Sequence, residues 1–204
     1  MPRKYTLGRR EQAVSETRAR IVSAARDLLM SRDGFLNFTV DGIAREAGVS
    51  RVTVYNQFES KTAIYEALAD ELALHGKIRD RLAAAFMEPD ARKGLSKLID
   101  AFVHFWLSEP DVLNKLHAMS QLDPDSKAAE RDAWRKEAIR TMVERLHKQL
   151  KVRGAARLQR DIDAIFMLTG FTTCESLARE GRSERQISNR IRELAGACLE
   201  ISLG

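Results

Sequence analysis

The segment from Ser50 to Lys61 concentrates side chains that are suited to contact nucleic acid. The candidates are Arg51, Val52, Thr53, Tyr55, Asn56 and Gln57. A guanidinium can bind guanine O6 and N7 or a phosphate, and side-chain amides can pair with adenine or bind the backbone. The methyl groups of Val52 and Thr53 can pack on thymine, and the hydroxyl of Tyr55 can reach a phosphate. The segment therefore predicts a surface that reads DNA.

Two short helices joined by a tight turn would hold these side chains in place. Thr39 is a suitable N-cap for the first helix, and small inward residues such as Ala44 allow the two helices to cross closely. Gly48 supplies a turn position that tolerates a positive φ, and Ser50 caps the second helix, predicted over residues 51–58. This pattern is typical of a helix-turn-helix, whose second helix enters the major groove.

The residues of this region, at their fixed spacing, closely resemble the TetR family of bacterial transcription regulators. The matching positions are Thr39, Ile43, Ala44, Ala47, Gly48, Val49, Ser50, Tyr55, Phe58 and Lys61. The resemblance covers about residues 15–75 and implies that Thr39 and Lys61 bind phosphates. Two positions depart from the family pattern. Gln57 stands where histidine or tyrosine is common, and Gly42 replaces a helix former at a cost of about 1 kcal/mol relative to alanine.

The whole chain has a formal net charge of +5, and part of this basic excess lies in its first residues. Residues 1–14 are predicted to form a flexible arm with Arg3, Lys4, Arg9 and Arg10, which could enter a neighbouring minor groove. The alternative is an ordinary solvated tail. We expect neither a signal peptide nor a membrane partner, since no apolar run approaches the roughly 20 residues that cross a bilayer.

An all-α fold is expected because the chain has only four prolines and no strand-like alternation. About nine or ten helices are predicted. One is the short helix capped by Thr39, and the others cover about residues 15–30, 51–58, 61–76, 77–87, 91–107, 112–122, 127–152, 158–180 and 183–203. Residues 15–75 would form a three-helix DNA-binding domain, and residues 76–204 a helical domain for effector binding and dimerisation. Phe35, Leu36 and Phe38 are expected to pin the loop after the first helix to the core.

Large side chains in the C-terminal part either form a packed core or line a ligand cavity, as the resemblance implies. The candidate ligand-binding residues are Phe102, His104, Phe105, Trp106, Met119, Trp134, Met142, Phe166 and Phe171. Aromatic and methionine walls suit a small hydrophobic ligand. His104 or His117 could orient a polar group of that ligand, or could be an ordinary surface or core histidine.

The last two predicted helices, within about residues 158–203, carry apolar faces that one chain is not expected to cover fully. One face includes Ile162, Ile165, Phe166, Gly170, Thr173, Cys174 and Leu177, and the other Ile187, Ile191, Leu194, Ala195 and Cys198. The resemblance implies that these helices pair with a second copy in a four-helix bundle; the alternative is burial within one chain. A twofold dimer would present two reading helices to a palindromic operator on double-stranded DNA.

The sequence favours a DNA-binding regulator, most simply a homodimeric repressor that a small hydrophobic ligand releases. An activator of the same fold and a ligand-independent DNA-binding protein remain alternatives. An enzyme is not expected, because only Asp100 and His104 at helical spacing hint at catalysis, and no metal or cofactor motif is present. Both Cys174 and Cys198 fall on apolar helix faces, so buried free thiols in a reducing cytoplasm are expected.

Overall fold

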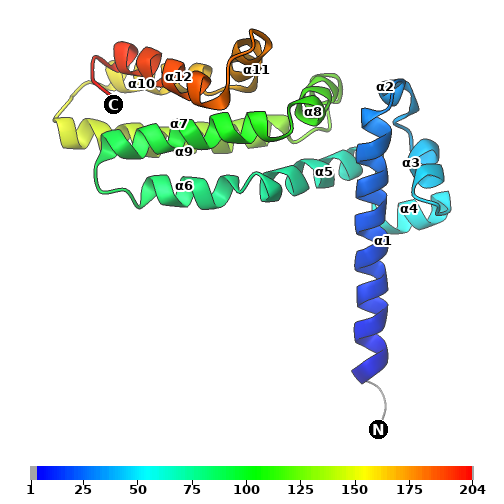
Figure 1. The fold of residues 1–204 in the computed structure, drawn as a ribbon. Coiled ribbons are helices and arrows are strands. Elements are labelled where there is room, and N and C mark those ends of the chain that lie inside the picture. Colours follow the sequence, from blue (N-terminus) through cyan, green and yellow to red (C-terminus); the bar gives the residue numbers. More distant parts are fainter. Residues whose placement is uncertain (1–3, 204) are drawn as a thin grey trace. The chain divides into compact units, whose positions relative to one another are not determined.

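The computed structural model describes residues 4–203, with side chains from Glu11 onward, and every regular element in that range is a helix (Figure 1). The helices are α1 (Lys4–Met30), α2 (Gly34–Asn37), α3 (Val40–Glu46), α4 (Arg51–Gln57), α5 (Lys61–His75), α6 (Ile78–Phe86), α7 (Ala91–Ser108), α8 (Pro110–Leu122), α9 (Ala128–Leu150), α10 (Ala155–Leu168), α11 (Phe171–Arg179) and α12 (Glu184–Leu199). The expected all-α fold is confirmed. Within the described range, no helix is both long and apolar enough to span a bilayer.

The N-terminal arm differs from its prediction. Helix α1 begins at Lys4 instead of Ser15, so residues 4–14 continue the first helix and are not a flexible arm. Good helix formers explain the extension, since residues 9–20 are rich in Arg, Glu, Gln and Ala. The backbone of residues 1–3 and the side chains of the four basic arm residues lie outside the described residues.

A second difference lies at Thr169 and Gly170, where the helix predicted over residues 158–180 divides into α10 and α11. In a continuous helix, backbone N–H groups four residues further on would occupy the carbonyls of Phe166 and Thr169. Side chains occupy them instead: Arg135 Nη1 donates to Phe166 O at 2.8 Å, and Trp106 Nε1 donates to Thr169 O at 2.9 Å. The break therefore has a tertiary cause.

The chain divides into two compact units. The first contains the residues up to Leu72 together with Asp111–Lys127, and the second contains Ala73–Pro110 and the residues from Ala128 onward. The main difference from the predicted boundary at residue 75 is that α8 and the loop after it belong to the first unit.

Polar contacts explain why α8 and its loop belong to the first unit. Lys115 Nζ donates to Leu29 O at the end of α1 over 2.7 Å. The Lys127 N–H donates to a carboxylate oxygen of Glu66 at 2.9 Å. These contacts attach both the helix and its following loop to α1 and α5.

The core of the first unit forms where α3 and α4 pack against α1 (Figure 1). Ile21 and Leu29 of α1, Ile43 of α3 and Leu68 of α5 are fully buried. The loop after α1 is pinned only in part, because Phe38 is buried whereas Phe35 and Leu36 are 46% and 82% exposed. The expectation that all three loop side chains reach the core was wrong for those two.

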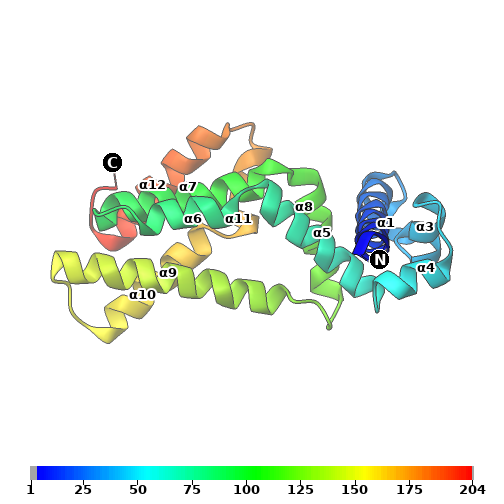
Figure 2. The same cartoon turned by 90° about the horizontal axis from the view of Figure 1, so that it is seen from below.

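Helix α7 is the centre of the second unit, where it contacts α6, α9, α11 and α12 (Figure 1, Figure 2). Its side chains Leu95, Leu98 and Ile99 are fully buried. Gly94 permits a close approach, since a Cβ there would lie 3.0 Å from Ala85 O and 3.1 Å from the sulfur of Met142. Burial on several sides makes α7 the scaffold around which the other helices pack.

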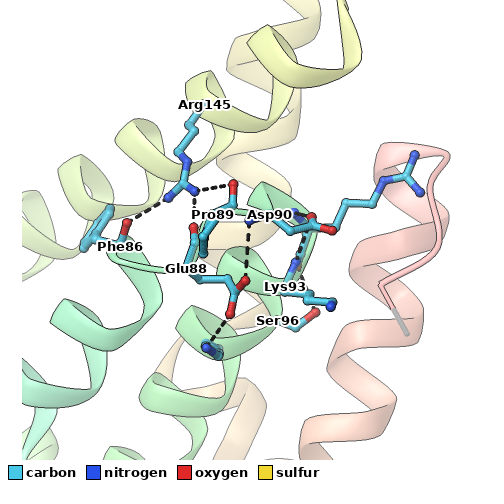
Figure 3. A network of polar contacts seen from close by, with 9 residues as sticks. Phe86, Glu88, Pro89, Asp90, Lys93, Ser96 and Arg145 are labelled. Carbon is cyan, nitrogen blue, oxygen red and sulfur yellow. Dashed lines mark hydrogen bonds and ion pairs between the residues drawn. The ribbon is translucent and has the colours of Figure 1, made fainter.

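A polar network fixes the turn between α6 and α7 to α9 (Figure 3). Arg145 donates to the carbonyl oxygens of Phe86 at 2.9 Å and of Pro89 at 2.8 Å, and also to that of Glu88. Asp90 caps α7 by accepting from the Arg92 N–H at 2.8 Å. The guanidinium thus satisfies carbonyls that the end of α6 leaves without helical partners.

Candidate nucleic-acid interface

Helix α3, the first of the helix-turn-helix pair, is closed at both ends by capping. At its start the Gly42 N–H donates to the side-chain oxygen of Thr39 at 3.0 Å. At its end Gly48 has a φ of 64°, and the Val49 N–H donates to Ala44 O at 2.9 Å. This is the Schellman geometry of a helix that ends at a glycine. The predicted cap and glycine turn are confirmed.

Gly42, which departs from the family pattern, has a steric reason. A Cβ at this position would lie 2.2 Å from the carbonyl oxygen of Asn37 and 3.1 Å from a methyl carbon of Leu28. The helix therefore approaches the preceding loop too closely to accept a side chain, and glycine overrides its low helix propensity.

Helix α4 turns most of its side chains outward. The Thr53 N–H donates to Ser50 Oγ at 3.0 Å, which confirms the predicted cap. Val54 and Phe58, 1% and 3% exposed, fix the inner face. The predicted DNA-contacting residues that are exposed are Thr39, Ser50, Arg51, Val52, Tyr55, Asn56 and Lys61, while Thr53 and Gln57 are half-buried. The exposed set forms an outer surface with donors, acceptors and methyl groups.

Arg18 of α1 supports the end of α4, a role that the sequence did not reveal. Its Nη1 donates to the carbonyl oxygen of Gln57 at 2.7 Å, and its guanidinium lies 4.0 Å from the ring centroid of Phe58. The contact satisfies a carbonyl at the helix C-terminus, where a cation is also favourable. In the sequence, Arg18 was only one of several basic residues near the N-terminus, so nothing distinguished it.

Arg51, the first residue of α4, forms an ion pair with Asp41 of α3. Arg51 Nε lies 2.7 Å from Asp41 Oδ1, and the two side chains are 62% and 63% exposed. The pair connects the two helices of the motif on their solvent side. The sequence did not predict it.

Three of the candidate ligand-binding residues come together beside the break between α10 and α11. The ring centroids of Phe105 and Trp106 lie 4.7 Å apart, and those of Trp106 and Phe171 lie 5.6 Å apart in an edge-to-face arrangement. The Trp106 N–H is used internally, since it donates to Thr169 O. The three rings form one aromatic cluster in the second unit.

A buried cation lies next to this aromatic cluster. The side chain of Arg135 is 8% exposed, and its guanidinium lies 3.7 Å from the ring centroid of Phe166. Arg135 Nη2 pairs with Asp132 Oδ1 at 3.2 Å, and Nη1 contacts Thr169 Oγ1 at 3.3 Å. Burial lowers the pKa of Arg135 below its ordinary value, and Asp132 opposes that shift.

The remaining candidates for the ligand site are scattered. Phe102 and Met142 are buried in the core of the second unit, whereas Trp134 is 51% exposed. Met119 belongs to the first unit. His104 pairs with Glu184 of α12, with 3.0 Å between Nδ1 and Oε1.

Asp100 and His104, whose helical spacing was the only hint of catalysis in the sequence, both have a structural role, because both bind α12. Asp100 accepts from Arg192 Nη1 at 2.8 and 2.7 Å through its two oxygens. Burial nevertheless raises the pKa of Asp100, against the effect of Arg192. Within residues 4–203, no group of three or more His, Cys, Asp or Glu side chains is placed to hold a metal ion.

The two faces predicted for pairing are largely, but not fully, covered within the single chain. Ile162, Ile165, Cys174, Ile187, Ile191 and Ala195 are all fully buried. Helices α10 and α12 contact each other and, through α9 and α7, close most of the apolar surface. What remains outward includes Met167 and Leu194, which are 72% and 42% exposed.

The cysteines also differ from expectation, because Cys174 is buried but Cys198 is exposed. Burial raises the pKa of the Cys174 thiol to about 12. Cys198 lies one turn after Leu194, on the outward side of α12. The prediction of two buried thiols is therefore wrong for one of them.

Comparison with known sequences supports the resemblance of the N-terminal unit to the TetR family. Residues 21–68 match the family described as bacterial regulatory proteins, tetR family. The nucleoid occlusion factor SlmA of Mannheimia succiniciproducens is 31% identical over 71 residues, which is 35% of this chain and 33% of SlmA. The HTH-type transcriptional regulator AlkX of Mycobacterium tuberculosis is 42% identical over 53 residues, 26% of this chain and 25% of AlkX. The chain thus matches only about a third or less of the length of these relatives.

A solved structure extends the similarity in fold over nearly the whole chain. A TetR-like transcriptional regulator from Rhodococcus sp. RHA1 aligns with a TM-score of 0.67 and 19% identity, over 90% of this chain and 96% of that one. At this identity the likeness concerns the fold alone. It includes the helices after α5, which the sequence matches cover less well.

Proposed function

We propose that the chain, whose residues 21–68 match the family described as bacterial regulatory proteins, tetR family, is a regulator of that family that binds a palindromic operator as a homodimer and represses transcription until a small hydrophobic ligand releases it. The observation that carries the proposal is the outer surface of α4. There Arg51, Val52 and Asn56 are exposed, on a helix fixed from within by Val54 and Phe58. Side chains that serve no purpose in packing are available to a partner.

The proposed contact residues divide into two roles in DNA binding. Thr39, Tyr55 and Lys61 bind phosphates and so set affinity and orientation. The base edges are read by Arg51, Val52, Thr53, Asn56 and Gln57. Thr53 and Gln57 are half-buried, so we assign the larger share of base contacts to the other three.

Homodimerisation through residues 158–203 would supply two reading helices at the spacing of successive major grooves, about 34–36 Å. Met167, Leu194 and Cys198 support this surface, because they are apolar or weakly polar side chains exposed on α10 and α12. Sedimentation equilibrium at micromolar concentration should give twice the chain mass. A monomer at all concentrations, with a single half-site in the bound DNA, would overturn this part.

The effector would be a small, largely apolar molecule that contacts the aromatic cluster of Phe105, Trp106 and Phe171. A ligand at 100 times its dissociation constant stabilises the folded state by about 2.7 kcal/mol. A thermal-shift screen of hydrophobic and aromatic compounds would detect such an effect. To act as an effector, the same compound must also weaken operator binding.

Sequence selection from random duplexes, followed by fluorescence anisotropy, tests the DNA contacts. Lys61→Ala should weaken binding to every sequence and reduce the slope of log K against log salt by about 1. Arg51→Ala should reduce the preference at a single base pair by roughly 10-fold. If Arg51→Ala leaves the base preferences of the selected site intact, the assignment of α4 as the reading helix is wrong.

We propose repression because a bound dimer that overlaps a promoter excludes polymerase. A reporter gene placed behind the selected operator distinguishes this from activation. Loss of reporter expression on adding the regulator, with recovery on adding the effector, is the expected result.

A further inference from the structure

Resting on the proposed DNA-binding function, we propose that Asp41 is a positioning residue that orients Arg51 to read a guanine. The ion pair joins Arg51 Nε to Asp41 Oδ1 at 2.7 Å. It links the first turn of α3 to the first residue of α4, the end of a reading helix that meets base edges.

The geometry leaves the useful edge of the guanidinium free. A guanidinium is a planar fork whose donors point in fixed directions. The carboxylate of Asp41 takes the Nε–H, so both terminal nitrogens can still donate in parallel. Two parallel donors are what the O6 and N7 atoms of guanine require.

The carboxylate also discourages the competing use of Arg51. An exposed arginine at a DNA surface can bind a phosphate, which adds affinity without sequence information. The negative charge of Asp41 beside the guanidinium repels phosphate oxygens, so the paired arginine is less suited to nonspecific binding. A bidentate contact with a base does not require that net charge.

A purely structural role does not explain the pair. Both side chains are more than 60% exposed, and an ion pair in water contributes little to stability. Capping by Thr39 and Ser50 already fixes the two helix starts between which the pair extends. The pair therefore controls the orientation of one side chain without holding the helices together.

The test compares base discrimination in the full-length protein. Selection with the wild type defines the site, and Arg51→Ala identifies the guanine that Arg51 reads. Asp41→Asn should then lower the discrimination at that base pair by about 3- to 10-fold and should tighten binding to unrelated DNA at low salt. Asp41→Glu, which keeps the carboxylate, should recover part of the discrimination.

Glu46→Gln is the matched control, because it removes one exposed negative charge from the same helix. It should leave the discrimination unchanged. In the Arg51→Ala background, Asp41→Asn should have no further effect on base preference, since the residue it positions is gone.

Two negative results are distinguishable. If Asp41→Asn tightens binding to all sequences equally and the discrimination ratio stays the same, this inference is wrong while the proposed function stands. If the wild type selects no sequence at all, the proposed function fails, and the inference fails with it.

Discussion

Helices α4 and α12 are both amphipathic, but they are held in the molecule in opposite ways. Of the 7 residues of α4 only Val54 is buried. Helix α12 has 16 residues, and it buries Ile187, Ile191 and Ala195 completely, with Ser188, Gly196 and Leu199 also buried. The first helix is positioned by a few contacts and displays its surface, whereas the second contributes most of its apolar surface to the core.

This difference separates stability from function along the chain. In α4, substitution of most side chains should alter DNA binding without altering folding, and only substitution of the few buried anchors should destabilise the fold, with loss of binding as a consequence. In α12, the buried apolar side chains are anchors, and the surface that we propose for pairing is limited to a narrow outward strip that includes Leu194 and Cys198.

The largest effect is expected from Phe58→Ala, which removes the anchor directly after α4. Loss of a buried phenylalanine costs about 3–5 kcal/mol, so unfolding of the first unit should occur at a clearly lower temperature and operator binding should be lost. Tyr55→Ala, three residues earlier and 50% exposed, is the matched control. It should change stability by less than about 0.5 kcal/mol while it weakens DNA binding. Equal losses of stability in the two variants would contradict the division within α4.

A second test concerns Gly42, whose helix propensity and packing predict opposite results. Propensity alone predicts that Gly42→Ala stabilises α3 by about 1 kcal/mol. The 2.2 Å approach of a Cβ to Asn37 O predicts instead a loss, of about 1–3 kcal/mol for an overpacked site. Thermal or urea unfolding decides between them.

Gly48→Ala is a useful comparison for Gly42→Ala. A Cβ at position 48 meets nothing within 4 Å, so its cost comes only from the positive φ of 64°, about 1 kcal/mol. If Gly42→Ala is neutral or stabilising while Gly48→Ala loses about 1 kcal/mol, close packing at Gly42 does not exclude a side chain there.

The contrast also explains what the sequence could predict. Caps and turns are local, so Thr39, Gly48 and Ser50 were identified correctly from residue type and spacing. Helix boundaries that depend on prolines or caps were close, as at Asp90 before α7. The same local pattern is the basis of the reading surface that we propose on α4.

Features with a tertiary cause were missed. Residues 158–180 keep a helical pattern through Thr169, and only Trp106 and Arg135, distant in sequence, reveal why the helix breaks there. Periodicity likewise shows that α12 has an apolar face but not which helices cover it. The outward position of Cys198 could not be predicted, because it depends on which helices cover α12.

Arg145→Ala tests whether the second unit tolerates the loss of a polar anchor. Its guanidinium holds the carbonyls of Phe86 and Pro89 at the α6–α7 turn (Figure 3). Water can reach part of this turn, so we expect a loss of about 1–2 kcal/mol, smaller than that of Phe58→Ala. Lys148→Ala, an exposed cation on the same helix, should be neutral. A loss as large as that of Phe58→Ala would show that this unit depends on its polar contacts as much as on its core.

The smallest effect on stability is expected at the two thiols, Cys174 of α11 and Cys198 of α12, and Cys198 also probes the outward strip of α12. At neutral pH a thiol-specific reagent should modify Cys198 but not Cys174, because Cys174 is buried and its pKa, raised to about 12, leaves almost no thiolate. Cys198→Ser should abolish the reaction without changing the unfolding temperature. If the outward strip of α12 pairs in a homodimer, the rate at Cys198 should fall as the protein concentration rises through the dimerisation range. A rate independent of concentration, in a protein that sedimentation shows to be dimeric, would mean that the chains pair through another surface.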